Sequence, residues 1–398
     1  MDWAPCWHGV ITPYCLLLGY VLPYSLFVIR TAQADYPGAR IYINDNIGDI
    51  TGGALFSFVL VHLVSPLQAI FLAHLPLLWA LYRLFPVAHR HRPPVLVAIG
   101  MLMAVLVSGL FLEEKSLAPA EGQLVDYRET RYGRIAVHKD QEQHTLFADG
   151  VPVISSQNLS LAEEIIHYPL AALDPVNRVL LISAQGGVMA ELKKYNVKAI
   201  DYVELDPAVT DVQFQFGLIE KIPGLNVIHQ DGRIYLSRTA KIYDAIIVNL
   251  PEPGTFQINR FYTRRFFELA RRHLSNRGVL SFAMQGYDNY LAEPQRQKLS
   301  SLYNTAKTQF KNILLLPGQK VFFLCSSRPL TTDIPAALEQ RHIDTAYISG
   351  FFYGNLTRQR IDYLNQRLDP SAALNTDTTP HLMRLMFSQW FAKFQTSP

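Results

Sequence analysis

The chain has 398 residues, of which 49% are hydrophobic and 17% charged, whereas soluble globular proteins carry about 25% charged residues. The formal net charge of +3 does not come with the dense Lys/Arg stripe that nucleic-acid binding requires, so we expect no nucleic-acid partner. The cysteines Cys6, Cys15 and Cys325 show no CxxC spacing, which excludes a disulfide framework and a zinc site from the expectations.

Uncharged runs long enough to cross a membrane recur in the first 112 residues. The run from Val10 to Ile29 has the roughly 20 residues that a spanning helix needs. The stretch from Ile50 to Tyr82 is expected to form two helices with a break at Ser65-Pro66, and a last run extends from Pro93 to Leu112. A large buried helical core is the alternative. The runs predict about four transmembrane helices in residues 1–115, and hence a multi-pass protein of the cell or inner membrane with lipid as a partner.

Charges in the loops between these runs leave the side of the membrane open. Arg30 and Arg40 flank the first loop, and Arg83, Arg90 and Arg92 line the loop before the last run. By the positive-inside tendency both loops would be cytoplasmic, which would place the C-terminal part on the other side. Acidic residues in the same first loop weaken this assignment.

Asp45 and Asp49 precede the second apolar stretch. We expect them to cap the N-terminus of a helix at the membrane interface, and a pair of intramembrane acids in a transport pathway is the alternative. Gly48, Gly52 and Gly53 are expected to permit close packing between helices.

After Glu113 the composition changes, and residues 116–157 predict a small β unit. Short strand patterns lie at 125–127, 133–138 and 144–147, with Asp149-Gly150 as a hairpin turn signal. Residues 158–173 then have helical periodicity, with a cap expected at Asn158 or Ser160.

From residue 177 onward, strand and helix patterns alternate. Strands are expected at 178–182, 199–204, 226–228, 243–248, 279–283 and 320–325, with helices after Gly187 and Asp206-Pro207 and over 260–274. This alternation predicts a doubly wound α/β sheet in residues 158–398, with ligands at the carboxyl ends of its strands.

The first of these strands is followed by Ser183-Ala184-Gln185-Gly186-Gly187. Glycines at such a turn let the backbone approach a ligand, although ordinary turn chemistry explains them equally well. The second strand ends in Glu204, about 20 residues past the glycines, where an acid can accept hydrogen bonds from a ribose diol. Asp206, before a proline, fits a helix cap as well.

Polar groups also follow the third and fourth strands. Asp231-Gly232 offers a carboxylate to an adenine amino group, with a turn aspartate as the alternative. Asn249 and Glu252 belong to a proline-rich loop that either shapes the rim of a cleft or is a plain surface loop.

The order of these motifs resembles the spermidine synthase (polyamine aminopropyltransferase) family, in particular its membrane-attached branch. The resemblance covers about residues 123–382. It rests on motifs at 129–135, 162–170, 203–207, 231–232, 259–263 and 374–377. It implies a Rossmann-like sheet of the class I methyltransferase type, S-adenosylmethionine or its decarboxylated form as donor, a small-molecule amine as acceptor, no metal, and a homodimer or larger oligomer.

By this resemblance, Gln185, Gly186 and Gly187 would approach the donor, Glu204 would bind its ribose, and Asp231 with Gly232 would bind its adenine. Asn249 and Glu252 would hold the acceptor. The chain departs from the family at two places. Family members carry an aspartate in the glycine-rich loop, and the shorter segment 183–187 of this chain has none. Family members also carry an aspartate directly after the fourth strand, where this chain has Asn249. An amide cannot accept a proton near neutral pH, so Glu252 is the remaining candidate base.

The leading functional hypothesis is therefore a membrane-anchored transferase that moves an aminopropyl or related alkyl group to an amine. A non-catalytic nucleoside-binding sensor and a small-molecule methyltransferase on the same fold are the alternatives.

Overall fold

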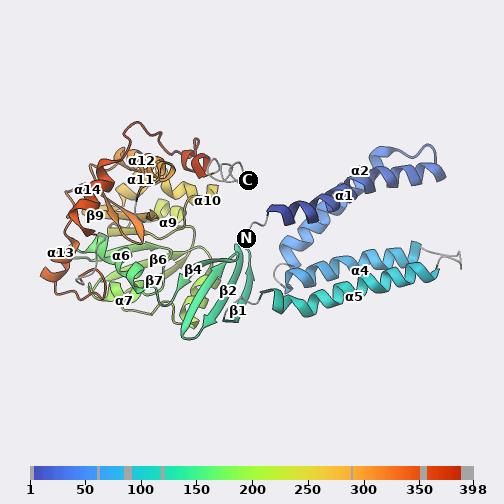
Figure 1. Cartoon of the computed structure of the whole chain (residues 1–398), viewed down its shortest axis with the longest axis horizontal. Helices are drawn as coiled ribbons and strands as arrows, with labels where there is room; N and C mark the ends of the chain where they lie inside the picture. The colour runs from blue at the N-terminus through green and yellow to red at the C-terminus, as the bar shows by residue number, and fades with distance from the viewer. Residues whose placement is uncertain are drawn as a thin grey trace. The chain divides into compact units, whose positions relative to one another are not determined.

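A computed structural model describes residues 4–60, 63–84, 92–117, 122–287, 290–349 and 356–386. The chain divides into two compact units, Met1–Ala118 and Pro119–Pro398, which are described separately (Figure 1). Arg90 of the predicted third loop lies outside the described residues.

The first unit consists of helices. They are α1 (Ala4–Ala32), α2 (Gly38–Leu55) continued by the π-helix η1 (Phe56–Leu60), α4 (Pro66–Leu84) and α5 (Arg92–Leu117). The helical restart at Pro66 agrees with the predicted break. Within the described residues, one helical window, Cys15–Ala32, is both long and apolar enough to cross a membrane, and shorter apolar helices cover Leu67–Ala80 and Ile99–Leu112.

Two expectations for the second helix are wrong. Helix α2 begins at Gly38, after Pro37, so Asp45 and Asp49 are exposed residues of its interior and cap nothing. The helix starts early because residues 39–47 contain no glycine or proline to interrupt it. A methyl group built on Gly48, Gly52 or Gly53 would meet no atom within 4 Å, so these glycines serve no close helix packing among the described residues.

The second unit opens with the predicted β unit, a four-stranded antiparallel sheet in the order β1-β2-β3-β4. Its strands are β1 (Gln123–Thr130), β2 (Gly133–Asp140), β3 (Gln143–Ala148) and β4 (Val151–Ser155). Asp149 and Gly150 both have positive φ values, +51° and +81°, which is the backbone of the tight hairpin turn that their sequence predicts.

The larger sheet has seven strands in the order β10-β11-β9-β8-β5-β6-β7. They are β5 (Arg178–Ile182), β6 (Ala199–Glu204), β7 (Leu225–His229), β8 (Tyr243–Val248), β9 (Leu274–Gln285), β10 (Asn312–Pro317) and β11 (Lys320–Ser326). Strands β5 to β9 are parallel, and β11 runs antiparallel between β9 and β10. This mixed sheet confirms the Rossmann-like, methyltransferase-type prediction.

Helices cover both faces of the sheet. On one face, α6 (Leu159–Leu170), α7 (Val188–Lys193) and α13 (Ile334–Gln340) pack against Val179 and Leu181. On the other, α9 (Gly232–Arg238), α11 (Arg264–Arg272) and α12 (Glu293–Lys307) pack against Leu180 and Ile182. Alternate side chains of β5 are thus buried on opposite faces, as expected for a central parallel strand.

The remaining helices connect these layers. They are α8 (Pro207–Gln215), α10 (Phe256–Asn259) with the short 3-10 turn η2 (Arg260–Tyr262), and α14 (Arg358–Gln366). Helix α8 buries Val212 in a separate small core with Ile135, Val137 and Leu146 of the four-stranded sheet. The single helix predicted over 260–274 is wrong, because Thr263 has an extended backbone with φ −102° and ψ 159° that separates η2 from α11.

Candidate functional site

A cavity of about 420 Å³ lies where the carboxyl ends of the large sheet face the four-stranded sheet. The small sheet contributes an apolar wall that includes Ile135, Leu146 and Ile154. The large sheet contributes residues that follow or begin its strands: Ser183, Ala184, Gln185, Glu204, Leu205, Asp206, Asn249, Leu250, Pro251 and Lys320. The predicted site residues Gln185, Glu204 and Asn249 are therefore brought together around one cavity, at the edge where an α/β sheet binds its ligands.

Glu204 ends strand β6 and lines this cavity. One carboxylate oxygen accepts a hydrogen bond from the Leu205 backbone N–H at 2.8 Å, and the other lies 3.3 Å from the Tyr202 hydroxyl. Burial raises the pKa of Glu204 above its ordinary value even though these bonds and one from Ser183 act to lower it. The carboxylate thus pays a desolvation cost that its protein partners do not offset, and it borders a cavity from which the hydroxyls of a ligand could reach it.

The loop from Ser183 to Gly187 has an unusual backbone. Ser183 has a φ of +61° and Gly187 one of +82°, values that non-glycine residues rarely adopt. A methyl group on Gly186 would overlap the backbone carbonyl of Ser155 at the end of β4. Gly186 is therefore explained by packing against the small sheet, and neither it nor Gly187 is among the residues that line the cavity. Gln185 does line it.

The two aspartates near the ends of β6 and β7 both cap helices. Asp206 accepts a hydrogen bond from the Ala208 N–H at 3.0 Å and another from the Thr130 hydroxyl at 2.6 Å. Asp231 caps α9 through the Ile234 N–H at 2.9 Å and pairs with Arg260. Asp206 borders the cavity, whereas Asp231 does not.

Gly232 follows Asp231 and lies against Ile182, whose side chain a methyl group would meet at 2.8 Å. A glycine is therefore needed here for α9 to pack against Ile182 of β5. Gly232 does not line the cavity. Adenine binding by Asp231 and Gly232 stays a prediction.

Asn249 and Glu252, which follow strand β8, have different surroundings. Asn249 lines the cavity, and its backbone N–H donates to the Ile182 carbonyl at 2.9 Å. Glu252 accepts from the Lys298 ammonium at 2.8 Å and from the Gln285 N–H at 3.0 Å, and it is not among the lining residues. Both oxygens of Glu252 are thus engaged with protein groups.

Lys320 also lines the cavity, and the sequence patterns did not single it out. It begins β11, which is antiparallel, and it pairs with Gln285 at the end of β9. The start of an antiparallel strand lies at the same edge as the ends of its parallel neighbours. The Gly318-Gln319-Lys320 turn before a buried strand was the available signal.

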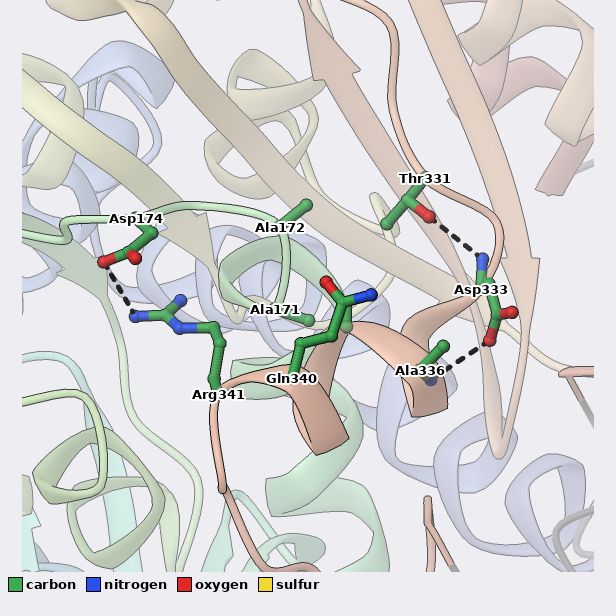
Figure 2. Close-up of a pocket in the computed structure, with 9 residues that line it drawn as sticks. Ala171, Ala172, Asp174, Thr331, Asp333, Ala336, Gln340 and Arg341 are labelled. Atoms are coloured by element: carbon green, nitrogen blue, oxygen red, sulfur yellow. Dashed lines mark hydrogen bonds and ion pairs between the residues drawn. The ribbon is translucent and has the colours of Figure 1, made fainter.

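A second cavity, of about 550 Å³, lies between the end of α6 and helix α13 (Figure 2). Its polar groups are engaged with one another. Asp174 lies 3.7 Å from the Arg341 guanidinium, and Asp333 accepts from the Ala336 N–H at 3.1 Å while its own N–H donates to Thr331 at 3.2 Å. Through these contacts Asp333 caps α13, and Asp174 pairs with Arg341. No predicted site residue lines this cavity.

No group of three or more His, Cys, Asp or Glu side chains suited to a metal ion occurs within the described part of the chain. The cavity beside Glu204 is lined by carboxylate, amide and amine side chains together with an apolar wall.

Residues 159–331 match the sequence profile of the spermine/spermidine synthase domain. A polyamine aminopropyltransferase of Oceanobacillus iheyensis is 26% identical over 373 residues, which cover 88% of this chain and 72% of that protein. One from Leptospira interrogans is 26% identical over 195 residues, 46% of this chain and 38% of that protein. The polyamine aminopropyltransferase 1 of Streptomyces coelicolor is 24% identical over 397 residues, 90% of this chain and 73% of that protein.

Solved structures with a similar fold include a spermidine synthase in complex with the transition-state analogue AdoDATO, at 16% identity and a TM-score of 0.49, covering 60% of this chain and 88% of that chain. The spermidine synthase of Thermotoga maritima has 15% identity and a TM-score of 0.49 and covers 62% and 87%. The matching region contains β5 to β9 and the Glu204 cavity edge. Residues 159–331 of this chain are thus similar in sequence to the spermine/spermidine synthase domain.

Proposed function

We propose that this protein is an aminopropyltransferase that takes an adenosylsulfonium donor, decarboxylated S-adenosylmethionine, and alkylates a small amine. The observation that carries the proposal is the position of Glu204 at the end of β6, with its carboxylate beside a 420 Å³ cavity. The domain match and the polyamine aminopropyltransferase relatives support the same reaction class. Binding of intact S-adenosylmethionine is the alternative for the donor.

In this reaction the lone pair of a neutral amine attacks the carbon next to the sulfonium. The carbon–sulfur bond breaks and its electron pair stays on sulfur, which leaves as a neutral thioether, while the nitrogen becomes a secondary ammonium. The leaving group needs no protonation, so the site acts mainly by alignment. The acceptor amine must lose its proton before attack, and we assign that proton to solvent.

Glu204 would accept hydrogen bonds from the two ribose hydroxyls of the donor. The apolar wall of Ile135, Leu146 and Ile154 would pack against the nucleoside. Gln185 and Asn249 would lie near the sulfonium end, because they follow the neighbouring strands β5 and β8.

Glu252 is the predicted base or amine anchor. Its bonds to Lys298 and to the Gln285 N–H favour a role in holding the loop after β8 in place. A base function of Glu252 stays a prediction.

Titration of the full-length chain with methylthioadenosine, decarboxylated S-adenosylmethionine and S-adenosylmethionine tests the proposal. We expect methylthioadenosine to bind and decarboxylated donor plus putrescine to release it as product. Failure of all three molecules to bind would refute the function. Binding without turnover over a panel of amines would favour a sensor, and transfer of a labelled methyl group would favour a methyltransferase.

We further propose that the helices of the first unit attach the domain to a membrane, with four spans. The window Cys15–Ala32 supports this, as do large exposed apolar side chains such as Leu16 at 69%, Phe58 at 80% and Phe111 at 79%. Side chains of this kind need a partner other than water, and lipid supplies one. A homodimer or larger assembly stays a prediction.

A further inference from the structure

A third cavity, of about 630 Å³, lies between helices α9 and α11, and no described residue lines both this cavity and the candidate functional site. Helix α11 contributes Arg265, Glu268 and Arg272, which are spaced three and four residues apart and therefore share one face of the helix. Helix α9 contributes Arg233, and the turn η2 contributes Arg260. Four arginines thus line one cavity, which we call the arginine cavity.

Positive charge is in excess around the arginine cavity. Three of its arginines are each paired with one acid: Arg233 with Asp377, Arg260 with Asp231, and Arg272 with Glu268. Arg265 has no carboxylate at ion-pair distance in the described part of the chain. It acts on Asp377 only through its charge, because the pKa of that carboxyl is lowered mainly by Arg233 and to a smaller extent by Arg265. Four positive charges therefore face three negative ones.

Two of the arginines keep N–H groups that no described protein group accepts. The guanidinium of Arg260 donates from Nε to the Gln257 carbonyl at 3.0 Å and from Nη2 to Asp231, which leaves its Nη1 group free within the described residues. Arg265 donates no guanidinium N–H to any residue that the structure describes. Both groups are therefore available to a ligand.

Arg233, in contrast, is held in place before any ligand arrives. Its side chain is only 16% exposed. It donates to both carboxylate oxygens of Asp377, at 2.7 and 2.9 Å, and to the Arg260 carbonyl at 3.0 Å. The arginine cavity thus combines one fixed guanidinium with two that have unused donors.

Guanidinium groups that share a cavity repel one another, and salt screens this repulsion less where the side chains are partly buried. An anion in the cavity would offset the repulsion and accept the unused N–H groups. A phosphate group suits this task because it carries up to two negative charges and three acceptor oxygens, so that it binds more than one guanidinium at once. A carboxylate offers one charge and two oxygens.

We propose that the arginine cavity binds a phosphate group, which belongs either to a free phosphate compound or to the head group of a lipid. This inference goes beyond the proposed transferase function and does not rest on it. Arg265 is the residue that tests it best, since its replacement breaks no ion pair among the described residues.

Isothermal titration of the full-length chain in nonionic detergent at low ionic strength tests the proposal. The probes are inorganic phosphate, dihexanoyl phosphatidic acid, which carries a phosphate group on a short lipid, and acetate as the carboxylate control. The variants are Arg265→Gln, Arg265→Lys and the control Arg328→Gln, which removes an exposed arginine that lines neither cavity. Partition of the lipid into detergent is the same for every variant, so differences between variants report the protein site.

We expect a phosphate-bearing probe to bind at least about 10-fold more tightly than acetate, and Arg265→Gln to weaken that binding about 10-fold or more. Arg265→Lys should lose less, because it keeps the charge but not the forked donors. Arg328→Gln should bind as the wild type does. Equal affinity for the two phosphate-bearing probes assigns the site to free phosphate compounds, and tighter binding of the lipid assigns it to a head group.

The inference is overturned if neither phosphate-bearing probe binds, if acetate binds as tightly, or if Arg265→Gln binds like the wild type. Equal losses in Arg265→Gln and Arg328→Gln would also overturn it, because they would show a response to net charge alone. Chemical denaturation of Arg265→Gln should match that of the wild type, which separates a lost site from a lost fold. Methylthioadenosine binding, measured beside these titrations, reports the transferase proposal independently.

Discussion

At the scale of single residues, Glu204 combines a stability cost with the ribose-binding role that we propose for it. Its carboxylate is buried beside a cavity and has a raised pKa. Carboxyl groups whose pKa is raised by burial beside a cavity are typical of functional sites. Ribose binding by Glu204 stays a prediction, and the position of Glu204 beside the cavity supports it.

We predict that Glu204→Gln weakens methylthioadenosine binding about 10- to 150-fold while leaving the unliganded protein equally or more stable. The amide has one acceptor oxygen and no charge, so it cannot offer a carboxylate oxygen to each of two hydroxyls, but its burial requires no desolvation of a charge. Isothermal titration and chemical denaturation measure the two effects. Equal binding by variant and wild type would contradict the role.

The raised pKa also gives a pH signature with a definite sign. Between the ordinary value of 4.5 and the folded pKa, the folded state binds more protons than the unfolded state at Glu204. Stability should therefore fall as pH rises through this window. Denaturation of Glu204→Gln should lack this slope.

Glu252 and Lys298 form a second residue-scale test. The Lys298 side chain is 5% exposed and its ammonium lies 2.8 Å from the Glu252 carboxylate. We predict that Glu252→Gln lowers the free energy of unfolding by about 3–5 kcal/mol, because it leaves a buried charge unpaired.

The double variant Glu252→Gln with Lys298→Met should regain much of that stability, since the unpaired charge is gone. If Glu252 only holds the loop, the double variant should also regain activity. If Glu252 instead accepts the proton of the acceptor amine, the double variant should be stable but inactive. A single variant as stable as the wild type would speak against the pairing.

At the scale of elements, Asp201 ties three parallel strands together. It lies in β6 and accepts hydrogen bonds from Asn226 of β7 and Tyr243 of β8, and from Lys241, all at 2.9 Å. Burial raises the pKa of Asp201, but these bonds outweigh burial and leave it below the ordinary 3.8. One buried acid thus links β6 to β7 and β8, at a distance from the carboxyl ends that face the cavity.

We predict that Asp201→Ala lowers the free energy of unfolding by about 2–4 kcal/mol, because several buried donors lose their acceptor. In the wild type this contribution is present above pH 3.8 and lost as pH falls through the lower folded pKa. Denaturation curves across acid pH measure both effects. The exposed control Asp211→Ala should change stability by less than about 0.5 kcal/mol.

Elements with strong local signals could be predicted from the sequence. Strands β6 and β8 lie where their apolar runs predict, and Asn158 caps α6 as expected. Strand β10 and helix α12 were not predicted, although Pro294 at the start of the helix and Pro317-Gly318 at the end of the strand were available signals. Lys320 was missed because its position depends on the antiparallel direction of β11, which pairing with β9 determines and local sequence does not.

At the scale of the whole molecule, the apolar first unit predicts how the protein fractionates. We expect the full-length chain to stay in the membrane pellet after alkaline carbonate extraction, because exposed apolar helices need lipid. Release into the supernatant would contradict membrane spanning. A reporter fused to the C-terminus would assign the side of the membrane, which the loop charges leave open.

Gly186 lies so close to the Ser155 carbonyl that no side chain fits between the turn after β5 and the end of β4. The backbone of this turn is therefore in direct contact with the backbone of β4, without room for even one methyl group. The position of the small sheet thus limits where the 183–187 turn, which borders the cavity, can lie. A change in the length of the β3–β4 hairpin should therefore displace the 183–187 turn, and with it weaken the nucleoside binding that we propose, before it lowers the stability of the fold.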